Sequence, residues 1–141
     1  MVAPSSGYWC ERAWVDGAVR SGVVVGVGED GRISEVEVGV TAPHQAEQLW
    51  GVVLPGFANA HSHAFHRALR GRTHDGPGSF WTWRDLMYRV ANRLDPDSYH
   101  RLARGVFGEM ALAGITSVGE FHYVHHRPDG GRYDDPNAMG E

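Results

Sequence analysis

Lysine is absent from this sequence of 141 residues, cysteine occurs once, and long apolar runs are missing. The single Cys10 excludes an internal disulfide, so we expect it at a packed strand position and not in a redox centre. No apolar run approaches the roughly 20 residues that span a bilayer, and the N-terminal residues lack the basic and apolar regions of a signal peptide. These absences predict a cytoplasmic protein that does not enter a membrane.

Charge is distributed unevenly along the chain. All 13 basic residues are arginines, and the formal net charge is −4. Arginines outnumber acidic residues only in residues 61–93, whereas residues 1–60 and 94–141 are each acidic. This balance does not support nucleic-acid binding along the whole chain. It favours a local site for an anionic small molecule, because the arginine guanidinium matches a carboxylate.

The first fifty residues predict a small antiparallel sheet. Apolar and alternating stretches indicate strands at residues 8–15, 22–28 and 33–38, and a further strand at residues 49–54 leads into the next segment. With 42% apolar residues in the chain, enough apolar surface is available to bury a core. We therefore expect a β-rich accessory domain over residues 1–54.

Helical signals begin after this region. A short helix is predicted over residues 63–70, and Ser79 can cap a second helix. In that second helix, apolar residues from Trp83 to Leu94 recur at helical spacing, so we expect this stripe in the core.

A third helix has the clearest signals at its ends. Asp95 is suited to the N-cap, Pro96 to the first turn and Gly114 to the position after the last turn. The helix leads directly into a predicted strand at residues 115–121. A strand, a helical crossover and a second strand indicate a parallel α/β fold over residues 55–141.

Two histidines, His61 and His63, follow the turn at residues 54–56. On an extended backbone, positions i and i+2 face the same way, so both rings can bind one metal ion. Glu120 and Tyr123 follow at the end of the second strand, and strand ends of a parallel sheet gather at one edge. The sequence thus predicts a catalytic metal site there, the alternative being an ordinary pair of polar loop histidines.

The Leu-Pro-Gly turn, the His-x-His pair and the strand at residues 114–118 resemble the amidohydrolase superfamily of metal-dependent hydrolases. Within it, residues 61–68, 79–88 and 120–126 resemble the formimidoylglutamate deiminases, which hydrolyse N-formimino-L-glutamate to N-formyl-L-glutamate and ammonia in histidine degradation. The resemblance implies an α/β fold: the start of a metal-dependent (β/α)8 amidohydrolase barrel, preceded by the small β-sheet domain.

The same resemblance implies roles for five side chains. His61 and His63 would bind one divalent metal ion, zinc foremost. Arg84 would pair with a carboxylate of a small-molecule dicarboxylate substrate, the alternative being a solvated helix arginine. Tyr123 would hydrogen-bond the substrate, the alternative being a half-buried aromatic at the rim. His66 stands where the family often has glutamine; it would contact the glutamate moiety, and its imidazole can change charge near neutral pH.

The other histidines have weaker signals. Three follow the second strand and are expected at the rim of the site: His122, His125 and His126. Three more have no motif around them and are expected at the surface: His44, His74 and His100.

A complete (β/α)8 barrel needs about 250 residues, so residues 55–141 can supply only its first βα units. The resemblance implies that the remaining metal ligands and the catalytic base come from later strands, beyond Glu141. We therefore expect no catalytic residue in this chain, no activity from the chain alone, and a longer protein that could form a homodimer. Two alternatives stay open: another deaminase of the superfamily, with less use for Arg84, and a non-catalytic truncated fragment.

Overall fold

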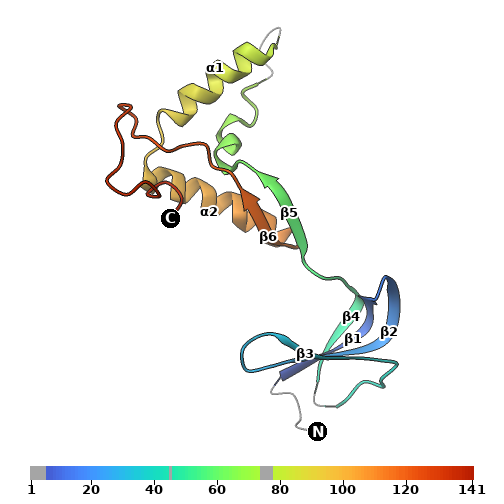
Figure 1. The fold of residues 1–141 in the computed structure, drawn as a ribbon. Coiled ribbons are helices and arrows are strands. Elements are labelled where there is room, and N and C mark those ends of the chain that lie inside the picture. Colours follow the sequence, from blue (N-terminus) through green and yellow to red (C-terminus); the bar gives the residue numbers. More distant parts are fainter. Residues whose placement is uncertain (1–5, 45, 74–77) are drawn as a thin grey trace. The chain divides into compact units, whose positions relative to one another are not determined.

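The computed structural model describes residues 6–44, 46–73 and 78–141 (Figure 1). The chain divides into two compact units, Met1–Pro55 and Gly56–Glu141. His74, expected at the surface, lies outside the described residues. Within the described part of the chain, no helix is long and apolar enough to cross a membrane.

The first unit contains a sheet of four strands in the order β3-β2-β1-β4. The strands are β1 (Ser6–Val15), β2 (Ala18–Val27), β3 (Ile33–Val38) and β4 (Glu47–Val53). β2 pairs antiparallel with both β1 and β3, whereas β4 runs parallel to β1. The predicted antiparallel arrangement is confirmed for β1, β2 and β3, and β4 joins the same sheet as a parallel strand.

The parallel strand arises because the chain passes beside β2 and β1 after β3 and does not turn straight back. The Val40 N–H donates to the Gly22 carbonyl, and the Val40 carbonyl accepts from Trp9 Nε1, both at 2.8 Å. The Glu11 carboxylate, at a bulge of β1, accepts from the Gly51 N–H at 2.8 Å. These hydrogen bonds attach the connection to β2 and β1, and β4 to β1, and alternation of apolar residues does not reveal them.

The core of the first unit contains Cys10, Ala13 and Val23. Cys10 is 1% exposed, which confirms the predicted packed strand position. Burial raises the pKa of its thiol, so the thiol stays protonated and inert at neutral pH.

The second unit is a strand-helix-strand crossover. β5 (Phe57–Ser62) and β6 (Ile115–Glu120) pair in parallel. Between them lie the 3-10 helix η1 (Ala64–Leu69) and the helices α1 (Phe80–Ala91) and α2 (Pro96–Leu112). This mixed α/β arrangement is consistent with the start of a larger α/β domain.

One boundary in this region differs from the prediction. Residues 49–54 were expected to form the strand that leads into the histidine pair, but β4 ends at Val53 and pairs with β1 in the first sheet. His61 lies instead in its own strand, β5. Pro55 has no N–H for a sheet, and the chain resumes pairing only at Phe57, whose N–H donates to the Gly114 carbonyl at 2.9 Å.

The predicted helix ends are confirmed. Ser79 and Asp95 each cap a helix in a capping box, with Thr82 and Ser98 as their respective partners. Hydrogen bonds donated by Ser98 hold the pKa of the Asp95 carboxyl below its usual value. Gly114 has a φ of +82° directly after the C-cap of α2, a conformation that favours glycine.

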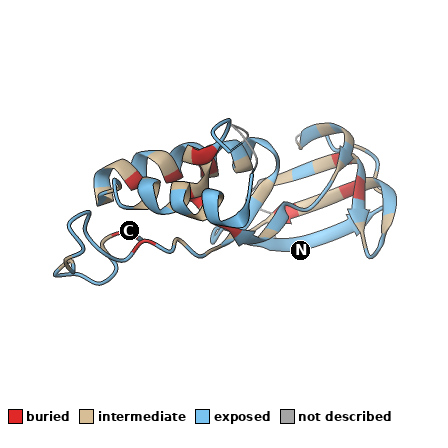
Figure 2. Cartoon of the chain, turned by 90° about the horizontal axis from the view of Figure 1, so that it is seen from above, coloured by how far each residue is buried: buried red, intermediate tan, exposed pale blue. Residues whose placement is uncertain are grey.

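The core of the second unit lies between η1 and α2. Its buried residues come from both helices and from the segment after β6: Ala64, Phe65, Tyr99, Ala103, Val106, Val124 and Met139. The predicted stripe on α1 only partly joins this core, because α1 has no fully buried residue. Four of its residues pack half-buried against the core: Met87, Val90, Ala91 and Leu94. Figure 2 shows correspondingly few buried positions along the helices.

Gly22→Ala is expected to destabilise the first unit more than Gly17→Ala. Both glycines have a positive φ, +61° and +77°, so alanine costs each about 1–2 kcal/mol in backbone strain. A Cβ at Gly22 would lie 2.5 Å from the Val40 carbonyl oxygen, whereas one at Gly17 meets nothing within 4 Å. The clash should add about 1 kcal/mol or more. Urea unfolding followed at β1 and β2 amides measures both changes, and equal losses would contradict the packing of Val40 against Gly22.

Candidate active site

The two parallel strands of the second unit end at a shallow hollow of about 350 Å³. It is lined by residues at the ends of both strands: Ala60, His61, Ser62, His63, Gly119, Glu120 and Phe121. Ser62 pairs with Glu120 in the parallel register, and the Phe121 N–H donates to the Ser62 carbonyl at 3.0 Å. The hollow therefore lies at the carboxyl edge of the sheet, where the sequence predicted the site.

The His61 and His63 rings converge in this hollow. Their Nε2 atoms lie 2.9 Å apart, and the ring centroids are 4.7 Å apart. His61 is exposed and His63 is half-buried. Two Nε2 atoms at this separation share one proton in a hydrogen bond. With that proton removed, each Nε2 atom has a lone pair that can bind a metal ion between the two rings.

A backbone carbonyl fixes the protonation pattern of His63. Its Nδ1 atom lies 2.7 Å from the Phe121 carbonyl oxygen. Because a carbonyl oxygen can only accept, Nδ1 carries the hydrogen, and the neutral ring has its lone pair on Nε2. Metal-binding histidines commonly have such a carbonyl behind them, which orients the ring and raises its basicity.

The pair fits two ligands of a divalent metal ion. Two imidazole nitrogens on a tetrahedral zinc ion lie about 3.3 Å apart, so the observed 2.9 Å requires an opening of only a few tenths of an ångström. Among the described residues, no group of three or more His, Cys, Asp or Glu side chains could hold a metal ion. The described chain thus offers two nitrogen ligands, which is fewer than a zinc enzyme uses.

His66 and Tyr123, two predicted substrate-binding residues, lie beside the pair. The His66 ring is 5.1 Å from His63 and stacks on Tyr123 with centroids 6.2 Å apart. Trp83 of α1 lies edge-on to His66, with ring centroids 5.6 Å apart. The buried His66 Nε2 has no hydrogen-bond partner among the described residues. A substrate atom could satisfy it.

The surroundings of His66 favour its neutral form. Desolvation by burial, and then the nearby His63, lower the pKa of the His66 imidazole below its usual value, against an opposing effect of Glu120. His66 is therefore neutral at neutral pH, and its charge change occurs at a more acidic pH. A neutral imidazole can donate or accept a hydrogen bond.

Tyr123 has an unusual backbone conformation. Its φ is +62°, which is rare for a bulky residue and marks local strain. This conformation brings its ring to 4.6 Å from His63 and 4.5 Å from Phe121, with 51% of the residue exposed. The strained turn thus presents the tyrosine at the rim next to the histidine pair.

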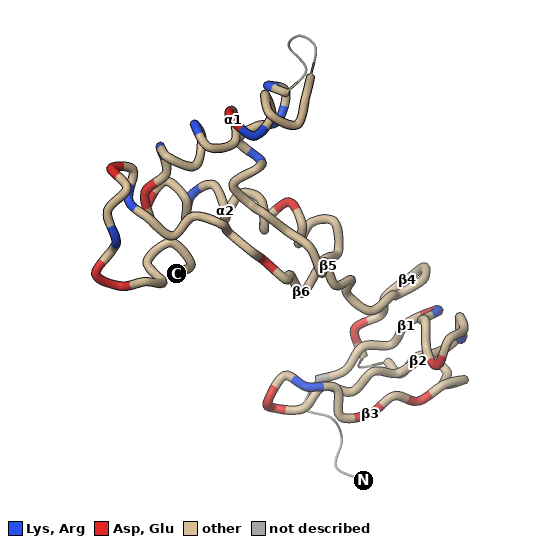
Figure 3. The backbone as a smooth tube through the Cα atoms, turned by 45° about the horizontal axis from the view of Figure 1, so that its top comes forward, with Lys and Arg blue, Asp and Glu red and all other residues tan. Residues whose placement is uncertain are grey.

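Arg84 is not in contact with the histidine pair. Its guanidinium carbon lies 4.8 Å from the Tyr88 ring centroid and 5.7 Å from that of Trp81, both on α1. Among the described residues it has no ion pair within 4.0 Å. Stacking on two rings restrains the guanidinium and leaves its edge available to a carboxylate. Figure 3 shows further basic positions along α1 and in η1.

The other described histidines follow β6 or lie at the surface. His122 and His125 lie together after β6, with centroids 4.6 Å apart, and the His126 backbone bridges to Arg132. His44 and His100 are exposed. Sequence reasoning gave no role to Phe121, whose carbonyl orients His63, and assigned Trp83, whose ring lies beside His66, only to the core stripe of its helix. The position of a main-chain carbonyl cannot be predicted from the residue type, whereas the aromatic residues after Ser79 could have indicated a ring near the site.

Comparisons with known proteins place this geometry in a family. The model of the amidohydrolase family matches residues 52–140. A crystal structure titled as an amidohydrolase from Brucella melitensis superposes with a TM-score of 0.88 at 34% identity, over 96% of this chain and 31% of that one. The chain belongs to the amidohydrolase family, as its sequence motifs predicted.

Curated relatives are deaminases and deiminases. The chain is 43% identical to formimidoylglutamate deiminase of Pseudomonas aeruginosa, over 95% of this chain and 30% of that protein. It is 32% identical to 8-oxoguanine deaminase of the same organism, over 68% of this chain and 22% of that protein. It is also 32% identical to 5-methylthioadenosine/S-adenosylhomocysteine deaminase of Pyrococcus furiosus, over 74% of this chain and 25% of that protein. The chain spans less than a third of the length of these relatives, and they support a hydrolase that acts on C–N bonds.

Replacing either His61 or His63 by alanine is expected to lower the zinc affinity of the chain at least about tenfold, because only one imidazole ligand would remain. A zinc titration followed by the ring signals of the histidines in NMR measures this. His100→Ala is the matched control, since His100 is exposed on α2. Equal affinity of all three variants and the unchanged chain would show that zinc binds elsewhere.

Proposed function

We propose that this chain carries the first metal ligands and part of the substrate site of a formimidoylglutamate deiminase. The enzyme would hydrolyse N-formimino-L-glutamate to N-formyl-L-glutamate and ammonia. The observation that carries the proposal is the convergence of the His61 and His63 Nε2 atoms beside His66 and Tyr123. The 43% identity to the Pseudomonas aeruginosa enzyme supports this substrate over those of the other relatives.

The metal would be held by the two Nε2 atoms of the histidine pair, together with ligands from the longer protein. A bound divalent ion such as zinc lowers the pKa of a coordinated water to about 7, which supplies a nucleophile at neutral pH. The chain's own contribution is orientation: the Phe121 carbonyl keeps the His63 lone pair on Nε2. Binding to His61 requires its ring hydrogen to be on Nδ1, which has no hydrogen bond to a described residue and can exchange with water.

The substrate would lie against the rings beside the metal ligands. The unpartnered His66 Nε2 can hydrogen-bond a polar group of the glutamate moiety, and the Tyr123 hydroxyl can do so from the rim. Arg84 would pair with a carboxylate of the substrate, and its stacking on Tyr88 limits the orientations of the guanidinium. Holding the reacting carbon in place is how such contacts increase the rate.

The reaction needs proton transfers that these residues do not provide. Water adds to the formimino carbon, the bond from that carbon to the terminal nitrogen breaks, and the nitrogen leaves as ammonia after taking both protons of the water. A general acid-base group must move these protons. In this proposal it belongs to the longer protein, as do the remaining metal ligands.

The test is ammonia release from N-formimino-L-glutamate with added zinc. The assay compares the 141-residue chain with a version extended in frame to the stop codon of its gene. We expect activity in the extended form only. Activity in the extended form on 8-oxoguanine or 5-methylthioadenosine in place of the dicarboxylate would favour another deaminase of the family, and a stop codon directly after Glu141 would favour a non-catalytic fragment.

Arg84→Ala in the active extended form is expected to raise KM for N-formimino-L-glutamate about 10-fold to 100-fold, the effect of losing one charge-assisted hydrogen bond. Arg89→Ala, an exposed arginine on the same helix, is the matched control and should leave KM unchanged. An unchanged KM in the Arg84 variant would remove Arg84 from the substrate site.

A further inference from the structure

Three consecutive residues around His63 are each hydrogen-bonded to the end of β6. The Ser62 carbonyl accepts from the Phe121 N–H at 3.0 Å, and the His63 Nδ1–H donates to the Phe121 carbonyl at 2.7 Å. The Ala64 N–H donates to Glu120 Oε1 at 2.7 Å. Two of these bonds use the main chain of Phe121, directly after β6, so only the third uses a side chain from this strand end.

This third bond satisfies a group that would otherwise be unpaired. Ala64 is the first residue of η1, and the first N–H groups of a helix have no partner inside it. The N-cap residue, His63, makes no side-chain cap hydrogen bond. Ala64 is 2% exposed, so water has little access. Glu120, which is 56 positions away in sequence, therefore supplies the cap that His63 does not.

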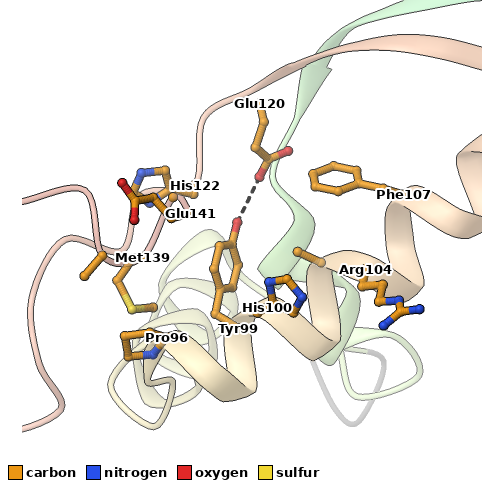
Figure 4. A pocket seen from close by; sticks show the side chains of 12 residues that line it. Pro96, Tyr99, His100, Arg104, Phe107, Glu120, His122, Met139 and Glu141 are labelled. Atoms are coloured by element: carbon orange, nitrogen blue, oxygen red, sulfur yellow. Dashed lines mark hydrogen bonds between the residues drawn. The ribbon is translucent and has the colours of Figure 1, made fainter.

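Glu120 is itself held in place from α2. The Tyr99 hydroxyl donates to the same oxygen, Oε1, at 3.2 Å (Figure 4). Tyr99 is buried, and both this burial and the Glu120 carboxylate raise the pKa of its hydroxyl, which therefore keeps its proton. Glu120 Oε2 is buried and has no hydrogen-bond partner among the described residues. The carboxylate is thus fixed by two donors on one oxygen.

We propose that Glu120 is a positioning residue for His63: by capping η1 at Ala64, it fixes the main chain directly after the histidine and keeps its Nδ1–H on the Phe121 carbonyl. The role of His63 as a metal ligand rests on the proposed function. The positioning itself concerns the ring, whose orientation follows from the peptide that Ala64 anchors. Sequence reasoning placed Glu120 at the strand end but gave it no role.

The test measures the His63 tautomer in the metal-free chain. Long-range ¹⁵N–¹H NMR correlations distinguish the Nδ1–H and Nε2–H forms at pH 8, above the ordinary imidazole pKa of about 6.5. We expect the unchanged chain to populate the Nδ1–H form, and Glu120→Ala to give a mixture of both forms. Glu120→Gln should restore the Nδ1–H form, because the amide oxygen can accept from both Ala64 and Tyr99. In a zinc titration, Glu120→Ala should lower the zinc affinity about 10-fold to 100-fold, which is the usual effect of removing a group that orients a metal ligand.

Glu109→Gln is the matched control for general loosening of η1. Glu109 on α2 pairs with Arg67 of η1, so this variant loses a different contact of the same helix. It should leave the His63 tautomer unchanged. An unchanged tautomer in Glu120→Ala, or an equal change in Glu109→Gln, would overturn the proposal.

Glu120→Asp covers the case in which the alanine variant does not fold. It keeps the charge but is one methylene shorter, so it should lose the Ala64 bond and give the mixed tautomer. A pure Nδ1–H form in folded Glu120→Asp with an exchange-labile Ala64 amide would overturn the proposal. The tautomer measurement uses no substrate, so it is independent of the deiminase assay. A negative deiminase assay does not contradict the positioning role of Glu120, and an unchanged tautomer does not contradict the deiminase activity.

Discussion

The hydrogen bond from the His63 ring to the Phe121 carbonyl, 2.7 Å long, joins residues 58 positions apart in the chain. It exists because β5 and β6 run parallel with Ser62 opposite Glu120. Parallel strands require a helical crossover, which α2 provides from Pro96 to Leu112. The packing of that helix thus determines which nitrogen of His63 is free to bind a metal ion.

The same register creates the surroundings of the histidine pair. Beyond the paired strand ends, the chain enters a positive-φ conformation at Tyr123, and the strain is offset by contacts of its ring with His63 and Phe121. The rings of His63, Phe121 and Tyr123 thus form a cluster, and His66 links it to Trp83 on α1.

Local signals predicted much of this arrangement. The capping residues Ser79 and Asp95 and the glycine after α2 act within a few residues, so the helix ends followed from sequence. The i, i+2 spacing likewise placed His61 and His63 together. The parallel pairing of β4 did not follow, since it depends on bonds such as Trp9 to Val40, 31 positions apart. The strand β5 was not predicted because its residues show little alternation of apolar and polar side chains. The Asp16–Gly17 hairpin turn, with φ of 49° and 77°, lets β2 begin at Ala18, earlier than the predicted start at residue 22.

Zinc K-edge X-ray absorption of the zinc-loaded chain tests the metal site most directly. We expect two imidazole nitrogens at about 2.0–2.1 Å from the zinc ion, with water completing the coordination. His63→Ala should remove one of the two imidazole contributions. A spectrum with oxygen ligands only, or one that is the same in the His63 variant, would contradict the assignment of His61 and His63 as a pair of metal ligands.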